Sequence, residues 1–196
     1  MKRKQLTVNE TLRFAKHDFL NDLQIISMNL QLGKVDEAKQ WIDQISMKLQ
    51  KQSLLHKLSL PLTTEWLLTV KWRYPEFQFT ITNEPMNRIS LHEDVDMQIV
   101  FYLEETMIQL QKNIDPYEEQ MIFIRFKQVE GSLHLQVEAQ GKWQAQLQLP
   151  RPEPYFIFIE KENSETKYVY ELSVAENYVE VVKDSLVLAK DAYMKK

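Results

Sequence analysis

Two stripes of mainly apolar residues run through the first sixty positions at helical spacing. The first stripe comprises Leu12, Lys16, Phe19, Leu23, Ile26 and Leu30. The second comprises Val35, Ala38, Ile42, Ile45, Leu49, Gln52 and His56. Steps of four and three residues, sustained over about three heptads each, are typical of the contact seam of a coiled coil. The pattern predicts two helices, and no proline interrupts either of them.

The connection between these helices is short and contains Gly33. Glycine is favoured where a helix ends in a left-handed residue, and a connection this short joins helices as an antiparallel hairpin. One hairpin cannot cover two apolar seams by itself. A second hairpin related by two-fold symmetry would cover both, so we expect a homodimeric four-helix bundle through residues of about 6 to 58.

The pattern changes after Pro61, and the period of two that is typical of strands becomes frequent. We expect a short helix over 62–72, a strand at Phe77, Phe79 and Ile81, and a helix over 91–112 that begins with a capping box of Ser90 and Glu93. Further strands are expected near 121–127, 133–139, 143–149, 155–160, 167–174 and 178–182, with a turn at Glu130 and Gly131. The tail 183–196 is compatible with a helix or a loose segment.

The fold class that follows is α+β, with a helical hairpin over 1–60 and a second domain with a mostly antiparallel sheet over 61–196. Net charge is −4, with 24 basic and 28 acidic side chains, which argues against a large nucleic-acid interface. The apolar runs are too short to span a bilayer, the basic N-terminus lacks the apolar core of a signal peptide, and cysteine is absent. We therefore expect a cytoplasmic protein without membrane partners.

Glycine is scarce: Gly33, Gly131 and Gly141 are the only three. Loops that bind nucleotide phosphates need glycine for close backbone approach, and no such motif is present. No two histidines have metal-ligand spacing, so we expect no intrinsic metal site or other cofactor.

The residues with the clearest chemical potential surround His17. This histidine follows the seam residue Lys16 by one position, so it lies on the flank of the predicted bundle. Positions three or four residues away share its face, with Gln24 one turn further. These neighbours are Arg13, Phe14, Leu20 and Asn21.

An exposed imidazole held on a helix suits a phosphoryl carrier, because neutral histidine is a nucleophile near pH 7. Cations and polar donors stabilise the charge on the transferred group, and Arg13, Lys16 and Asn21 are placed for this role. Asp18 would orient the ring or accept a proton, although adjacent helical residues point about 100° apart. Two alternatives stay open here. The first alternative is that His17 is an ordinary surface residue without a catalytic role. The second concerns Phe14 and Leu20, which either form a partner surface or widen the core stripe.

The segment from His17 to Lys34, H-D-F-L-N-D-L-Q-I-I-S-M-N-L-Q-L-G-K, resembles the sporulation initiation phosphotransferase B family, which carries H-D-x-x-N-x-L-Q on the first helix of a dimerising hairpin. The likeness is specific over about twenty residues and extends to chain length and the α+β second half. The H-D-x-x-N box also occurs in citrate-type and quorum-sensing sensor kinases. One departure is Lys16, where the resemblance leads us to expect arginine; the charge is kept but the bidentate geometry is lost.

This resemblance implies that His17 accepts a phosphoryl group from the aspartate of one response regulator and passes it to a second, in sporulation initiation. Asn21 and Asp18 match the other fixed polar positions of the motif. The second domain would resemble a histidine-kinase ATP-binding domain that no longer binds ATP, and Mg²⁺ would be supplied by the partner's receiver domain. Consistent with this, the helix over 91–113 has no asparagine until Asn113, so we expect no autokinase activity.

Two other functions remain compatible with the sequence. A non-catalytic dimeric module that binds a response regulator or kinase would share the bundle without histidine chemistry. A truncated sensor kinase would share the motif but use ATP.

Overall fold

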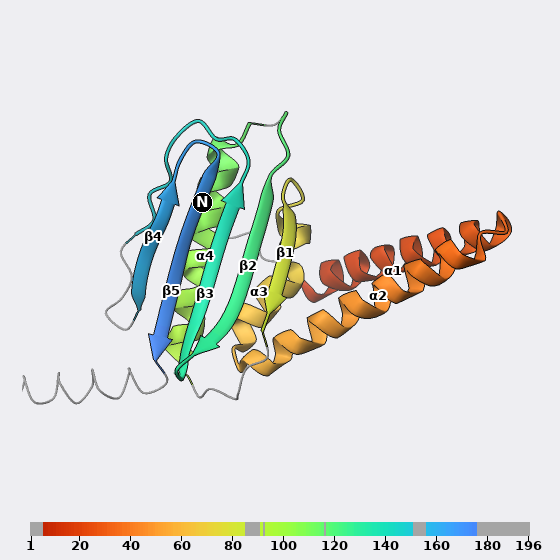
Figure 1. Cartoon of the computed structure of the whole chain (residues 1–196), viewed down its shortest axis with the longest axis horizontal. Coiled ribbons are helices and arrows are strands. Elements are labelled where there is room, and N and C mark those ends of the chain that lie inside the picture. The colour runs from red at the N-terminus through yellow and green to blue at the C-terminus, as the bar shows by residue number, and fades with distance from the viewer. Residues whose placement is uncertain (1–5, 85–90, 92, 116, 151–155, 176–196) are drawn as a thin grey trace, which may run out of the picture.

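The structure is a computed structural model and describes residues 6–84, 91, 93–115, 117–150 and 156–175. A long helical hairpin projects from a body in which helices cover one face of a sheet (Figure 1). In chain order the elements are α1 (Val8–Gln31), α2 (Val35–Leu55), the 3₁₀ helix η1 (His56–Leu58), α3 (Pro61–Arg73), β1 (Gln78–Asn83), α4 (Glu93–Asn113), β2 (Met121–Val129), β3 (Ser132–Gln140), β4 (Ile157–Asn163) and β5 (Lys167–Ala175).

Both ends of α1 are closed by local hydrogen bonds. Thr7 and Glu10 form a capping box, in which the Glu10 N–H donates to the Thr7 hydroxyl at 3.2 Å and the Thr7 N–H donates to the Glu10 carboxylate at 2.8 Å. At the other end Gly33 has a φ of 71°, and the Lys34 N–H donates to the Asn29 carbonyl at 2.9 Å. The predicted hairpin with its turn at Gly33 is confirmed, and the capping box of Thr7 and Glu10 is a further signal that the sequence analysis did not use.

The first apolar stripe of the hairpin is largely uncovered within a single chain. Leu12 is 63 % exposed, Phe19 is 61 % exposed and Leu23 is 46 % exposed. Val35, Ile42 and Leu49 of the second stripe are also exposed. An isolated hairpin therefore presents a contiguous apolar surface of the kind that mediates association.

The sheet is mixed, with strand order β1-β2-β3-β5-β4. β1 runs parallel to β2, and the other neighbouring strands are antiparallel. Glu130 and Gly131, with φ of 49° and 80°, form the two-residue hairpin turn between β2 and β3. α4 covers one face of this sheet (Figure 1), and its buried Tyr102 and Leu103 share a core with Ile124 of β2.

The predicted fold class is confirmed, but the strand expected over 143–149 is wrong. Within that segment only Trp143 makes a bridge, to Ile114. Side-chain amides replace strand pairing: Asn163 donates to the Leu147 carbonyl at 2.8 Å and accepts from its N–H at 3.3 Å. Gln109 bonds both main-chain groups of Gln148 in the same way. Because these amides satisfy the backbone, the segment needs no neighbouring strand.

Other boundaries shift slightly. α4 begins at Glu93 rather than at position 91, and β4 extends to Asn163. Ser90 of the expected capping box, the strand over 178–182 and the tail 183–196 lie outside the described residues.

Two buried carboxylates of α4 join it to α3. Asp96 accepts from the N–H groups of Leu62 and Thr63 at 2.7 and 2.8 Å, and from the Thr63 hydroxyl at 2.6 Å. It thereby caps the N-terminus of α3, whose own N-cap residue makes no side-chain cap bond.

Glu104 forms the second joint. Its carboxylate accepts from the Trp66 indole at 2.6 Å, the Tyr74 hydroxyl at 2.9 Å and the Arg73 guanidinium at 3.3 Å. Burial together with this carboxylate raises the pKa of Tyr74. The hydroxyl therefore stays protonated and keeps donating to Glu104.

In the part of the chain described, no helix is both long and apolar enough to cross a membrane.

We predict that Asp96→Ala lowers the free energy of unfolding by about 1–3 kcal/mol, because it leaves buried donors at the start of α3 without an acceptor. Urea unfolding followed by circular dichroism measures the change. Asp96→Asn keeps an acceptor oxygen and should lose less, while Met97→Ala, at a half-exposed neighbouring position, should lose less than about 1 kcal/mol. An Asp96→Ala variant as stable as the unmodified protein would contradict the capping role.

Candidate functional site

The candidate site lies on the exposed flank of α1, in the part of the hairpin nearer the body. His17 is exposed and lies in the middle of the helix. Its Nδ1 atom is 3.2 Å from the amide Nδ2 of Asn21, one turn further along. The structure therefore brings together the two polar residues that the sequence motif singles out, on one face of a continuous helix.

The hydrogen bond between these side chains determines which ring nitrogen is free. With the Asn21 amide nitrogen facing Nδ1, the amide donates and Nδ1 accepts, which leaves the ring proton on Nε2. Rotating the amide by a half turn presents its oxygen instead, and Nδ1–H then donates to it. In that arrangement Nε2 carries a free lone pair. Asn21 is thus able to stabilise either neutral tautomer.

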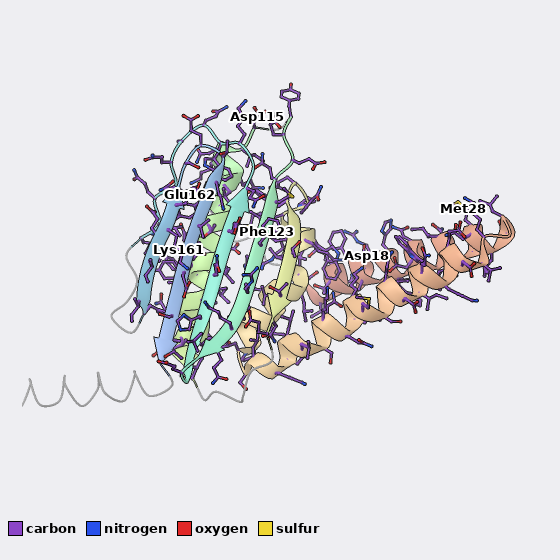
Figure 2. All side chains as sticks on the ribbon, viewed as in Figure 1. Asp18, Met28, Asp115, Phe123, Lys161 and Glu162 are labelled. Atoms are coloured by element: carbon purple, nitrogen blue, oxygen red, sulfur yellow. The ribbon has the colours of Figure 1, made fainter. Side chains whose placement is uncertain are left out.

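Asp18, the next residue after His17, lies on the part of α1 near the body (Figure 2). Its carboxylate accepts from the Lys71 ammonium and, at 3.2 Å, from the Trp72 indole N–H, both on α3. The structure places Asp18 in contact with α3, while Asn21 contacts the ring.

An aromatic stack lies beside this ion pair. Phe14 of α1 stacks on Trp72 with ring centroids 5.8 Å apart and an angle of 17° between planes. Arg13 lies over the Phe14 ring, 5.3 Å from its centroid, and Lys71 lies 5.0 Å from the Trp72 centroid. We call Phe14, Asp18, Lys71 and Trp72 the α1–α3 bracket, because these four side chains attach the hairpin to the body next to His17.

The electrostatics of the bracket favour an ionised carboxylate. Burial raises the pKa of Asp18, but the hydrogen bond and charge of Lys71, with the Trp72 N–H, outweigh it and leave the pKa below its usual value. The ion pair therefore persists through the neutral range.

The other predicted site residues have different environments. Lys16, Leu20 and Gln24 are exposed on α1. Phe14 is half-buried in the bracket, so it belongs to the contact between hairpin and body as well as to the flank of His17. Arg13 is folded over Phe14.

Sequence reasoning missed Lys71 and Trp72 as neighbours of the site. They lie 53 and 54 residues beyond Asp18 in the chain, and no local pattern links them to it. Only the packing of α3 on α1 reveals the role of this pair. Among the described residues, no group of three or more histidine, cysteine, aspartate or glutamate side chains is arranged to hold a metal ion.

The comparisons with known proteins bear on the hairpin. Residues 1–58 match the family model described as sensor kinase SpoOB-type, alpha-helical domain. The hairpin belongs to the SpoOB-type family. This match agrees with the resemblance seen in the H-D-x-x-N segment and places the chain, at a coarse level, among two-component signalling proteins. No curated protein matches the chain significantly.

Solved structures with a similar course of the chain include histidine kinases. The Acinetobacter baumannii histidine kinase AdeS has 12 % identity and a TM-score of 0.41, covering 82 % of this chain and 98 % of its own. The histidine kinase domain of the Erythrobacter litoralis EL346 blue-light activated kinase has 8 % identity and a TM-score of 0.44, covering 81 % and 84 %. A structure described as a bacterial phosphotransferase has 12 % identity and a TM-score of 0.36, covering 88 % and 100 %. Likenesses this distant carry no functional argument.

We predict that the contact of Asp18 with α3 makes the free energy of unfolding depend on pH. Because the folded pKa of Asp18 is depressed, its stabilising contribution is fully present above the unfolded pKa of about 3.9 and is lost as pH falls through the lower folded value. Asp18→Asn should therefore cost about 0.5–1 kcal/mol of unfolding free energy between pH 7 and pH 5, a small value because the ion pair is partly exposed. The cost should vanish in acid.

Urea unfolding of both proteins across this pH range provides the measurement. Asp43→Asn removes an exposed carboxylate of α2 and should leave the pH profile unchanged. A stability difference between Asp18→Asn and the unmodified protein that does not shrink in acid would contradict the bracket.

Proposed function

We propose that this protein is a histidine phosphotransferase of a phosphorelay. His17 takes a phosphoryl group from the aspartate of one response-regulator receiver domain and delivers it to the aspartate of a second. The observation that carries the proposal is an exposed mid-helix imidazole paired with Asn21, inside a hairpin of the SpoOB-type family.

Neither step of the reaction requires the gain or loss of a proton. Nε2 of His17 attacks the phosphorus of the incoming aspartyl phosphate, a P–N bond forms, and the P–O bond to the carboxyl breaks, which releases the aspartate carboxylate. In the second step the carboxylate of another receiver attacks phosphorus, and the P–N bond breaks to restore the Nε2 lone pair. The ring keeps its proton on Nδ1 throughout, where the Asn21 amide oxygen would accept it.

The surrounding side chains support this chemistry in distinct ways. Lys16 is an exposed cation one residue from His17 and would stabilise negative charge on the phosphoryl oxygens. Leu20 and Gln24, also exposed on α1, would contact the docked receiver. Mg²⁺ would come with the receiver, whose own acidic pocket binds it. Asp18, held by Lys71 and Trp72, would act by positioning α1.

We predict that His17→Ala abolishes transfer of label from a phosphorylated single-domain receiver, because it removes the nucleophile. Asn21→Ala should slow transfer by about tenfold or more, because the ring loses the partner that holds its tautomer. Gel autoradiography with acid and alkali treatment distinguishes histidine from aspartate label. His56→Ala is the matched control, since His56 is also exposed, follows α2 directly and lies outside the site.

Two outcomes would redirect the proposal. Transfer that survives in His17→Ala would exclude His17 as carrier. Label incorporated from ATP and magnesium without any receiver would indicate a sensor kinase.

We propose further that two hairpins associate as a four-helix bundle in a cytoplasmic homodimer. This proposal is supported by the stripe of Leu12, Phe19 and Leu23, whose apolar side chains are exposed to water in the single chain. Burial of such side chains against a second copy contributes about 25 cal/mol per Å² of apolar surface removed from water. His17 lies beside this stripe rather than in it, so the bundle would leave the ring accessible.

We predict that Leu23→Glu shifts the protein from dimer to monomer, because it places a charge in the seam. Leu20→Glu is the matched control: both leucines are 46 % exposed in the single chain, but Leu20 lies off the predicted stripe. Sedimentation velocity over a range of concentrations reports the oligomeric state. Equal behaviour of the two variants would contradict the seam.

A further inference from the structure

β1 is the sheet edge that lies nearest to α2 (Figure 1), and a groove of 720 Å³ separates the two elements. Residues 79–83 of β1 line one wall, and Met47, Lys48 and Lys51 of α2 are part of the other. β1 pairs with β2 alone among the described strands. The groove therefore runs along the free edge of a sheet.

The register of the parallel pair determines which main-chain groups face this groove. The Gln78 N–H donates to the Gln120 carbonyl at 2.8 Å, and the Glu84 N–H donates to the Phe126 carbonyl at 3.0 Å. In a parallel ladder alternate residues direct both of their main-chain groups to the same neighbour. Thr80 and Thr82 therefore bond to β2, while Phe79 and Ile81 direct their N–H and C=O groups away from β2, on the side of the groove. Across the described residues no hydrogen bond reaches those groups.

The Asn83 side chain extends this unpaired edge. Its amide nitrogen donates to the Leu54 carbonyl of α2 at 2.9 Å, and its amide oxygen is buried without a partner among the described residues. An unpaired buried acceptor is unusual in a folded protein. The groove thus offers donors and acceptors of the kind that an added strand satisfies.

The groove also has a uniform charge. Lys48, Lys51 and Lys71 line it, and no aspartate or glutamate does, although the chain as a whole carries a charge of −4. Lys71 is paired with Asp18, and the charge of Lys48 also lowers the pKa of that carboxylate. Within the described residues neither Lys48 nor Lys51 forms an ion pair, so both are available to an occupant. Apolar side chains, among them Leu55, Leu67 and Phe79, also line it. This combination suits an extended segment in which acidic and apolar side chains alternate.

We propose that this groove is a docking site for an extended acidic segment of a partner protein, which adds to β1 as a sixth strand. Lys48 and Lys51 would contact its acidic side chains, and Phe79 and Ile81 would bond its main chain. The site is distinct from His17, and the proposal does not depend on the transfer reaction.

Two other occupants fit the groove less well. Residues 176–196 of this chain contain four acidic and four basic side chains, so the segment as a whole has no net charge with which to complement the lysines, although Glu176 and Glu180 precede its first base. A second copy associating through the predicted stripe would use Ile42, Ile45 and Leu49, whereas Gln44, Met47 and Lys51 line the groove from a neighbouring face of α2. Gln52 belongs to both surfaces, so such a dimer would cover one margin of the groove and leave the rest open.

The test uses the full-length protein and a fluorescein-labelled peptide in which glutamate alternates with valine. Fluorescence anisotropy should detect binding that weakens with salt, because the attraction involves exposed charges. The Lys48→Glu, Lys51→Glu double variant should weaken binding by about tenfold or more. Lys39→Glu reverses an exposed charge of the same helix outside the groove and should have little effect. A peptide with lysine in place of glutamate should not bind.

Amide hydrogen exchange measured by NMR separates strand addition from general charge attraction. Phe79 and Ile81 amides should exchange rapidly in the free protein and slow on peptide binding, whereas Thr80 and Thr82 should be protected in both states. His17→Ala should bind the peptide with unchanged affinity, so failure of the transfer reaction would not affect this result.

Several results would overturn the proposal. Absence of peptide binding would do so, as would binding that leaves the Phe79 and Ile81 amides unprotected. Protection of both amides before peptide is added would mean that residues 176–196 or a second copy already cover the edge, and its dependence on protein concentration would distinguish these two.

Discussion

The contact between Asp18 and α3 determines how the hairpin is presented. Successive residues of a helix point about 100° apart, so a helix that directs Asp18 toward Lys71 and Trp72 must direct His17 to a different side. Packing of Phe14 on Trp72 adds apolar contact to the ion pair on the same side of α1. The imidazole is left exposed because its neighbour is held. The exposure of His17 is thus a consequence of the attachment of α1 to the body.

Hydrogen bonds to two carboxylates of α4 fix the position of α3 in the body. Asp96 and Glu104 of α4 each accept several hydrogen bonds from α3, at its N-terminal end and along its length. Both carboxylates are buried, where hydrogen bonds compensate for the loss of hydration. α4 in turn packs on the sheet through its apolar face. A continuous path of contacts therefore connects the sheet to the bracket beside His17.

Three faces of the hairpin have separate properties. One carries the exposed apolar stripe of Leu12, Phe19 and Leu23, another carries His17 and Asn21, and a third, on α2, carries the lysines that face β1. A helix has room for such a division because residues three or four apart share a face and adjacent ones do not. Self-association, phosphotransfer and docking of an acidic segment would therefore use largely different side chains, with Gln52 shared between the second stripe and the groove. The face of α2 that borders the groove is also the one with clustered lysines, in a chain whose net charge is negative.

Local signals in the sequence were sufficient for the hairpin, its glycine turn, most strands and the shared helical face of His17 and Asn21, because each depends on residues a few positions apart. The hydrogen bond between Asn21 and the ring was not predicted, since the sequence analysis assigned the orientation of the ring to Asp18. Periodicity of 3.6 or two residues, a capping box and a left-handed glycine are properties of short segments. The tertiary structure alone decided that Asp18 bonds to α3, that Asp96 caps a helix more than thirty residues earlier, and that the 143–149 segment is held by Gln109 and Asn163 instead of forming a strand. These contacts join residues far apart in the chain, and which distant side chain satisfies a buried donor or charge depends on how the elements pack in space.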